Sequence, residues 1–269
     1  MSGFSADWLA LREPYDLGAR NRDVLERVAA AFAREPAIAV VDLACGTGST
    51  VRALAAHLPA RQSWRLVDND LGLLARAAAA DRPPDLRVTS TPVDLARDLE
   101  AALDGPLDLV TTSALLDLVS AEWLERFVAE VAARRLPVYA ALTYDGRAAL
   151  SPADPLDQAV VASVNRHQRG DKGFGAALGP TAVAAALSAF ARVAYEVVHG
   201  SSDWVLGPSD QEMQGEVLAG WAGAARELGD VALPDLMAWI TRRRELIAAG
   251  TSHLRVGHVD VFARPTGRR

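Results

Sequence analysis

The stretch AIAVVDLACGTGST, residues 37–50, decides how the rest of the chain is organised. Its first half is a short apolar run rich in β-branched residues, long enough for a buried parallel strand and too short for a helix. Asp42 stands near the end of that run, and Gly46 and Gly48 follow it. Glycine lets the backbone turn sharply and approach a ligand closely. A strand, a glycine turn and a helix start predict a nucleotide-type cofactor site at the carboxyl end of the strand.

The residues around the two glycines narrow the choice of cofactor. A dinucleotide fingerprint needs a third glycine three residues after the second, and Val51 occupies that position. Asp42 would also repel a pyrophosphate. A Walker-type phosphate loop ends in Gly-Lys, but the only lysine of the chain, Lys172, follows Asp171. An acid ahead of the glycines suits a ligand that carries positive charge.

The motif V-x-D-L-A-C-G-T-G, residues 40–48, resembles the first motif of the class I S-adenosylmethionine-dependent methyltransferases. The ammonium and the sulfonium of that cofactor make the resemblance chemically sensible. It implies that one carboxylate and the glycine turn hold the methionine end of S-adenosylmethionine and of its product, S-adenosylhomocysteine. The residues concerned are Asp42, Ala44, Cys45, Gly46 and Gly48.

The composition limits the class of protein. The chain has 269 residues, half of them hydrophobic, which suits one large α/β domain with additions. A formal net charge of -6 argues against a nucleic-acid partner. Cys45 is the only cysteine, so an intrachain disulfide is impossible. The start of the chain lacks a secretory pattern and no apolar run approaches about 18 residues, so we expect a cytoplasmic protein without membrane association.

A second strand that ends in acids follows at residues 64–70. Asp68 stands twenty residues after Gly48, the distance at which α/β nucleotide folds place an acid on the ribose hydroxyls. We therefore expect Asp68 to bind the ribose, with Asn69 beside the adenine. The alternative is that Asp68 only caps the helix that starts near Asp70.

A third strand, residues 86–90, also precedes an acid. In the family that the chain resembles, an acid just after the third strand accepts a hydrogen bond from the adenine amino group, and apolar neighbours sandwich the ring. The resemblance gives that role to Asp94, with Val93 and Leu95 beside it. The alternative is that Asp94 is an N-cap for a helix over residues 95–103, and both roles can hold together.

A fourth strand at residues 106–113 leads into residues 114–119, which resemble the family segment that runs under the methyl donor. The resemblance places Ser113 near the cofactor. Asp117 stands where many relatives have histidine, and this departure leaves the role of that position open. A fifth strand follows at residues 136–142.

Strand and helix alternate five times, which predicts an α/β fold with a mostly parallel, Rossmann-like sheet and helices on both faces. A sixth strand at residues 193–198 and a last strand at residues 255–263 match the antiparallel pair that closes the sheet in the family. The resemblance therefore implies seven strands in the order 3-2-1-4-5-7-6, with an added helical cover.

The alternation also suggests how the chain is divided. We expect residues 1–34 to form an N-terminal helical cover of one or two helices, with a break at Pro14. Residues 35–269 would form the methyltransferase domain. Two inserts would interrupt it, a substrate loop at about 143–180 and a helical segment at about 201–250.

Cationic side chains in the cover and in the substrate loop suggest ligand contacts. In the cover, Arg12, Tyr15 or Arg20 could reach the cofactor carboxylate, or the cover could be a packed helix with solvated charges. The substrate loop gathers cations that could hold an anionic substrate, since an arginine fork suits a carboxylate; a solvated polar loop would look the same. These cations are Arg166, His167, Arg169 and Lys172.

The remaining polar and aromatic side chains supply few firm assignments. Trp204 either lines the substrate pocket or belongs to the core. A general base is needed only if the acceptor arrives protonated, and Tyr144, His167 and Asp117 are the candidates. His253 and His258 are five apart, hence on opposite faces of a strand, so we expect no metal site.

The predicted function is S-adenosylmethionine-dependent methyl transfer to a small-molecule acceptor. The acidic balance of the chain and its folded additions favour such an acceptor over RNA or DNA. Two alternatives stay open: an S-adenosylmethionine-binding protein without transferase activity, which would act as a sensor or partner, and a nicotinamide-dependent oxidoreductase.

Overall fold

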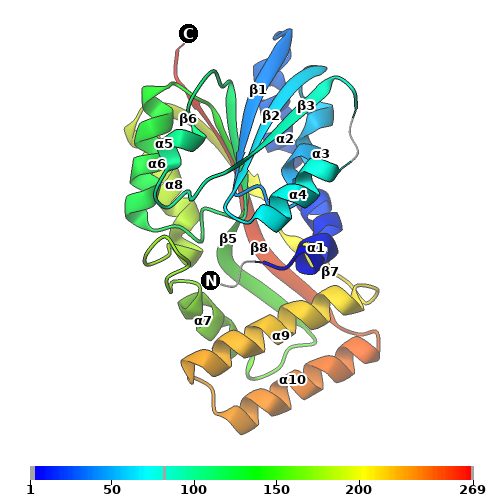
Figure 1. Ribbon diagram of the computed structural model, residues 1–269. Helices are drawn as coiled ribbons and strands as arrows, with labels where there is room; N and C mark the ends of the chain where they lie inside the picture. Colours follow the sequence, from blue (N-terminus) through cyan, green and yellow to red (C-terminus); the bar gives the residue numbers. More distant parts are fainter. Residues whose placement is uncertain (1–3, 81–82, 268–269) are drawn as a thin grey trace.

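The protein is built on a single twisted sheet flanked by helices (Figure 1). The computed structural model describes residues 4–80 and 83–267. Within them the sheet has eight strands, seven of which follow one another in the order β3-β2-β1-β4-β5-β8-β6, while β7 pairs with β8 beside that row. The strands are β1 (Ala37–Leu43), β2 (Arg61–Asp68), β3 (Leu86–Pro92), β4 (Leu109–Ser113), β5 (Val138–Ser151), β6 (Tyr195–Ser201), β7 (Trp204–Leu206) and β8 (His253–Pro265).

The predicted fold class is confirmed, and the predicted strand count is one short. The first five strands are parallel, and β8 runs antiparallel between β5 and β6. The additional strand β7 forms because β8 is long. Its second half pairs with β6 from Val259 onward, which leaves the edge of its first half open to pairing with Trp204–Leu206.

Helices cover both faces of the sheet, as predicted. One face packs against α5 (Leu99–Ala102), α6 (Ala121–Ala133) and α8 (Ala182–Arg192), and the other against α2 (Arg22–Phe32), α3 (Ser49–Leu54) and α4 (Leu71–Ala79) (Figure 1). Alternate residues of β1 serve the two cores. Val41 and Leu43 face the first, and Ile38 and Val40 face the second. Burial on both faces explains why β1 is apolar almost without interruption.

Residues 143–151, expected to begin a substrate loop, instead continue β5. Two register shifts, between Ala140 and Thr143 and between Tyr144 and Ala148, bend the strand, and it then stays paired with the first half of β8. The two strands form an arm that leaves the main sheet (Figure 1). A third core on this arm packs α7 (Asp157–His167), α9 (Gln211–Leu228) and α10 (Leu233–Ala248).

The helix α1 (Ala6–Ala19) runs through Pro14, so the predicted break at that residue is wrong. Proline removes one helical hydrogen bond, but the residues on either side are tied together. Arg12 pairs with Asp16 one turn later, and the pair is buried. The chain turns after Arg20, where Asn21 caps α2. Among the described helices, none combines the length and apolar character that crossing a bilayer demands.

Candidate functional site

The turn after β1 brings main-chain groups to the edge of the sheet. Ala44, Gly46 and Gly48 have φ values of 52°, 54° and 83°, a left-handed conformation that glycine adopts without strain. The turn is closed by a hydrogen bond from the Gly48 N–H to the Cys45 carbonyl oxygen at 2.8 Å. The Cys45 N–H donates in turn to the Val67 carbonyl oxygen at 2.9 Å, which fixes the turn against β2.

Asp68, the last residue of β2, holds this turn from the side. Its Oδ2 accepts from the Gly46 N–H at 2.9 Å and its Oδ1 from the Asp70 N–H at 3.0 Å. The helix cap is Asp70, whose Oδ1 accepts from Gly72 and Leu73 N–H groups, so the alternative of Asp68 as the cap is wrong. Asp68 therefore joins the glycine turn to the start of α4.

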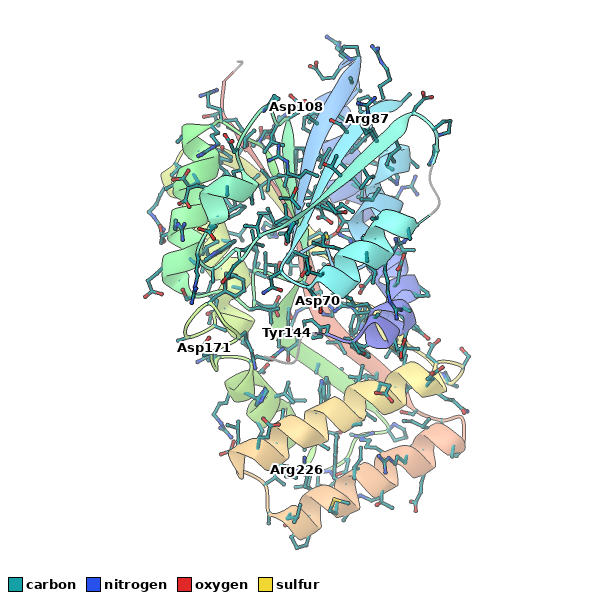
Figure 2. All side chains as sticks on the ribbon, viewed as in Figure 1. Asp70, Arg87, Asp108, Tyr144, Asp171 and Arg226 are labelled. Carbon is teal, nitrogen blue, oxygen red and sulfur yellow. The ribbon has the colours of Figure 1, made fainter. Side chains whose placement is uncertain are left out.

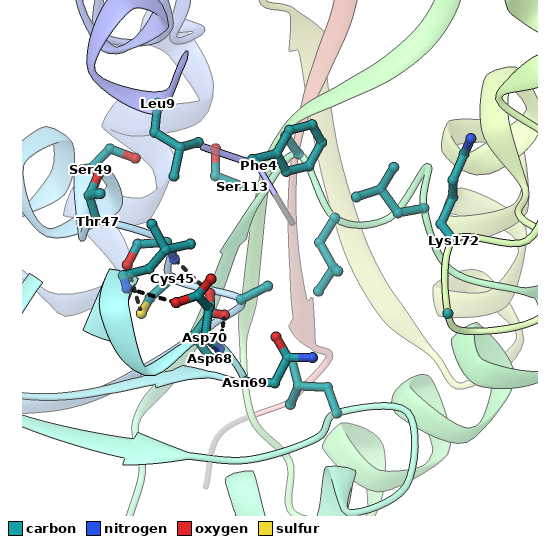
Figure 3. A pocket seen from close by; sticks show the side chains of 18 of the residues that line it. Phe4, Leu9, Cys45, Thr47, Ser49, Asp68, Asn69, Asp70, Ser113 and Lys172 are labelled. Carbon is teal, nitrogen blue, oxygen red and sulfur yellow. Dashed lines mark hydrogen bonds between the residues drawn. The ribbon is translucent and has the colours of Figure 1, made fainter. Parts of the chain in front are cut away.

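A cavity of about 870 Å³ opens at the carboxyl ends of β1 to β4 (Figure 3). The structure brings ten of the sequence-predicted site residues to its wall. They are Ala44, Cys45, Gly46, Asp68, Asn69, Val93, Asp94, Leu95, Ser113 and Lys172. Seven others do not line it: Asp42, Gly48, Tyr144, Arg166, His167, Arg169 and Trp204.

Carboxylates dominate the charge of the cavity wall. Among the described residues, five acidic side chains line it, and only Arg12 and Lys172 bring positive charge. The acids are Asp16, Asp68, Asp70, Asp94 and Asp171. The guanidinium of Arg12 is already paired with Asp16, at 2.9 Å between Nε and Oδ2. The cavity therefore favours a ligand of net positive charge.

Apolar side chains line the part of the cavity near β3. Val93 and Leu95 come from the segment after β3, and Leu115 and Leu118 from the segment after β4. Between the first two, the Oδ1 of Asp94 accepts from the Ala96 N–H at 3.1 Å. Asp94 thus starts a tight turn, and the helix expected over residues 95–103 is only the short α5.

Asp42, near the end of β1, is fully buried. It does not line the cavity itself, whereas the residues of the glycine turn that follows it do. Its Oδ1 accepts from the Thr111 hydroxyl at 2.8 Å, while its Oδ2 has no partner among the described residues. Burial raises the pKa of Asp42 to about 7, against the lowering effect of the Thr111 hydrogen bond and of the nearby Arg20 guanidinium. Such a carboxylate is stabilised by a cationic partner.

Helix α1 supplies wall residues whose role the sequence motifs did not determine. Arg12 and Asp16 line the cavity, whereas Tyr15 donates to Asp210 and Arg20 is buried behind Ser113. The pairing of Arg12 and Asp16 at helical spacing is visible in the sequence. That the pair faces a ligand cavity follows only from the packing of α1.

The basic cluster expected in the substrate loop does not converge on the cavity. Arg166 pairs with Asp230, from the turn between α9 and α10. The Nε2 of His167 contacts a Glu227 carboxylate oxygen at 2.9 Å. Lys172 alone of the four lines the cavity, and its Nζ lies 3.5 Å from the Nδ1 of His167.

Tyr144 and Trp204, the other two substrate-side predictions, lie in the base of the arm. The Tyr144 hydroxyl donates to the Asn165 side-chain oxygen at 2.7 Å. The Trp204 indole N–H donates to Asp16 at 3.0 Å, so Trp204 supports the cavity wall from behind. Within residues 4–80 and 83–267, no group of three or more potential ligand side chains could hold a metal ion.

A salt bridge fastens α1 over the glycine turn. Leu9 of α1 lies above the turn: a Cβ on Gly46 would come within 3.2 Å of its Cδ1. Nearby, Arg52 of α3 pairs with Glu13 of α1 and donates from Nη1 to the Thr47 carbonyl oxygen at 2.9 Å. The contact joins α1 to the helix that the turn opens.

We expect Arg52→Ala to loosen α1 without unfolding the protein. The pair is partly exposed, so its loss should change the free energy of unfolding by less than about 1 kcal/mol. Amide hydrogens of α1 should exchange several-fold faster, which hydrogen-exchange mass spectrometry measures. Arg22→Ala is the matched control, because its pair with Glu26 is exposed and lies away from the turn. Unchanged exchange in α1 would show that the salt bridge does not hold the helix.

Comparison with known proteins connects this site to one family. Residues 40–136 match a family model described as a methyltransferase domain. No curated protein matches the sequence. The matched segment begins within β1, ends just after α6 and contains the glycine turn, Asp68 and Asp94.

The chain is also similar to solved structures. The chain is similar to a cyclopropane-fatty-acyl-phospholipid synthase-like protein from Lactobacillus casei, with 15% identity, a TM-score of 0.54, and coverage of 97% of this chain and 94% of that one. It is also similar to the cyclopropane synthase MmaA2 from Mycobacterium tuberculosis (12% identity, TM-score 0.46, coverage 90% and 83%). A third similar structure is a methyltransferase from Thiobacillus denitrificans in complex with S-adenosyl-L-homocysteine (14% identity, TM-score 0.44, coverage 97% and 99%). The resemblance to the class I methyltransferases is thus confirmed over the matched domain.

Proposed function

We propose that the chain transfers the methyl group of S-adenosylmethionine to a small-molecule acceptor. One observation carries the proposal: a cavity of about 870 Å³ lies over the glycine turn of a methyltransferase domain, at the carboxyl ends of β1 to β4. In open α/β sheets, ligands bind at that edge. The residues at the cavity come from the ends of four strands, from α1 and from residues 171–174, so segments far apart in the sequence assemble the site.

The lining supports assignments for the parts of this cofactor. The main-chain groups of Ala44–Gly46 would hold the methionine end, with Asp42 behind them. Asp68 would hold the ribose, while Val93, Leu95, Leu115 and Leu118 offer apolar contacts for the adenine and Asp94 a polar one. The bound cofactor would supply a methyl carbon activated by a sulfonium. The residues of the chain would then align the acceptor, an entropic contribution of up to roughly 7–11 kcal/mol.

The charge of the wall favours this cofactor over a dinucleotide. S-adenosylmethionine carries one net positive charge, whereas the pyrophosphate of a nicotinamide cofactor is negative. Five carboxylates against two cations repel the second and attract the first. The absence of a third glycine at Val51 points the same way.

Calorimetry with S-adenosylhomocysteine, NADH and adenosine tests the proposed cofactor. We expect S-adenosylhomocysteine to bind with a dissociation constant in the micromolar range, on the order of −8 kcal/mol, and NADH to give no heat of binding. Adenosine serves as the control for adenine contacts alone and should bind more weakly. Saturable binding of NADH in place of S-adenosylhomocysteine would refute the proposed cofactor.

A further inference from the structure

A loop at residues 171–174, after α7, supplies part of the cavity wall from outside the parallel strands (Figure 2, at Asp171). Each of its four residues lines the cavity. The loop is held at two places. The Asp171 Oδ1 accepts from the Gly173 N–H at 2.6 Å, and the Phe174 ring lies edge-on to the Trp123 ring, with centroids 5.5 Å apart. The backbone of the loop is therefore fixed against the main body of the protein.

Lys172 is the cation of this wall that no carboxylate neutralises. The other cation that lines the cavity within the described chain, Arg12, is paired with Asp16. The Lys172 ammonium forms no ion pair with any described residue, and its one polar contact there is with the His167 Nδ1, at 3.5 Å. An ammonium has three N–H donors, so two of them are available to a ligand. Because the side chain is half-buried, an anion in the cavity would stabilise its charge.

Two residues that do not line the cavity position this ammonium. The His167 Nε2 lies 2.9 Å from a carboxylate oxygen of Glu227 in α9. A carboxylate only accepts hydrogen bonds, so His167 carries a proton on Nε2. Its Nδ1 then has a lone pair that accepts from Lys172. His167 and Glu227 therefore act on a ligand in the cavity only through the lysine.

The cavity has room and apolar surface for a second molecule beside the cofactor. Its volume of about 870 Å³ is near the upper end of the range for one drug-sized ligand, about 300–1,000 Å³. Phe4 and Phe174 are the aromatic side chains of its wall within the described chain. Lys172 lies across the cavity from Cys45 and Thr47, with Phe4 between them in the view of Figure 3. A cofactor whose methionine end lies at the glycine turn therefore leaves Lys172 to the acceptor.

We propose that the methyl acceptor is a small compound with an apolar body and one carboxylate, and that Lys172 binds this carboxylate. The inference rests on the proposed function and narrows the class of acceptor. One ammonium neutralises one negative charge, whereas a phosphomonoester would keep an excess of negative charge near the five carboxylates of the wall. A cationic acceptor would be repelled both by Lys172 and by the donor, which carries one net positive charge. The apolar body would pack against Phe4 and Phe174.

Four probes that share one benzene ring test this class of acceptor. Benzoate carries one negative charge, benzamide none, benzylamine one positive charge and phenyl phosphate up to two negative charges. Saturation-transfer NMR measures the binding of each probe to the complex with S-adenosylhomocysteine. We expect benzoate to bind about fivefold or more tightly than each of the other three, as one partly buried ion pair allows.

Lys172→Met removes the charge and keeps most of the length of the side chain. It should weaken benzoate binding about fivefold or more, and leave the affinities for benzamide and S-adenosylhomocysteine within about twofold. Arg169→Met is the matched control, because Arg169 is an exposed cation of the same segment that does not line the cavity. This control should leave the affinity for benzoate within about twofold.

His167→Leu tests the positioning of the lysine, because leucine cannot accept from the ammonium. The substitution should weaken benzoate binding about threefold in the otherwise native chain and have no effect in the Lys172→Met variant, since a double-mutant cycle isolates the coupling of the two side chains. His167→Gln, which keeps an acceptor oxygen, should restore most of the binding. An equal loss in both backgrounds would overturn the positioning role.

Three results would overturn the proposed acceptor class: tighter binding of another probe than of benzoate, no binding of any probe, or unchanged benzoate binding by Lys172→Met. A loss of about tenfold in S-adenosylhomocysteine affinity in Lys172→Met would also overturn it, because the lysine would then serve the cofactor. Failure of the wild type to bind S-adenosylhomocysteine would instead refute the proposed function.

Discussion

Asp68→Ala should weaken the binding of S-adenosylhomocysteine by about 100-fold. The substitution removes the carboxylate that accepts from both the Gly46 and Asp70 N–H groups, at 2.9 and 3.0 Å. Hydrogen bonds to a charged group contribute about 1.5–3 kcal/mol each. If the turn loosens when both are lost, their combined energy corresponds to a loss of about a hundredfold or more in affinity. The proposed ribose contact would be lost as well. Isothermal titration calorimetry measures the change.

Asp70→Ala is the matched control for this substitution. Asp70 also lines the cavity, but its Oδ1 accepts from the Gly72 and Leu73 N–H groups at the start of α4 and not from the glycine turn. Loss of the cap costs about 1 kcal/mol of stability, and we expect an affinity loss of less than about tenfold. Equal effects of the two substitutions would show that Asp68 is not specifically responsible for the turn. Unchanged affinity in Asp68→Ala would remove the ribose assignment.

Asp42→Asn should make the protein more stable at about pH 8, and weaken its cofactor binding. The folded protein holds the pKa of Asp42 at about 7, above the ordinary value of 3.8. Between these values the folded chain binds one more proton than the unfolded chain, so stability falls as the pH rises from about 4 to 7 and stays low above. The difference between a pKa of about 7 and one of 3.8 corresponds to about 4 kcal/mol of stability, and asparagine should recover about 2–4 kcal/mol of it.

Urea denaturation at about pH 4 and pH 8 separates this pH-dependent gain in stability from a change in stability that is the same at every pH. The gain should be present at the higher pH and nearly absent at the lower, where the carboxyl group is protonated in both states. A second measurement, calorimetry with S-adenosylhomocysteine at the higher pH, should show weaker binding if Asp42 supports the methionine end. A variant that is less stable than the wild type at both pH values would contradict the assignment of a buried, unsatisfied charge.

The parallel sheet was predictable because strand and helix alternate over residues 37–142, whereas the order of its strands came from the resemblance to the class I methyltransferases. β1 shows why, since its alternate residues serve two cores and leave an unbroken apolar signal. The arm was not predictable. Residues 143–151 contain Asp145, Gly146 and Arg147, a composition typical of loops, and they form a strand only because β8 lies beside them.

The residues of the site also fall into a part that could be predicted from the sequence and a part that could not. The residues at the carboxyl ends of β1 to β4 were predictable, because their positions follow from the strands that carry them, and most of them line the cavity. The substrate-side predictions depended on side chains from distant segments. Arg166 is engaged by Asp230, 64 residues away, and Trp204 packs behind Asp16, 188 residues away. Local composition carries no information about such pairs.

The carboxylate-rich wall also bears on turnover. S-adenosylmethionine carries one net positive charge, but its demethylated product carries none, because the sulfur becomes neutral. Five carboxylates opposed by two cations therefore attract the donor more strongly than the product. Methylation would weaken the electrostatic hold on the spent molecule at the moment it should leave, and the difference in retention should shrink as added salt screens the wall.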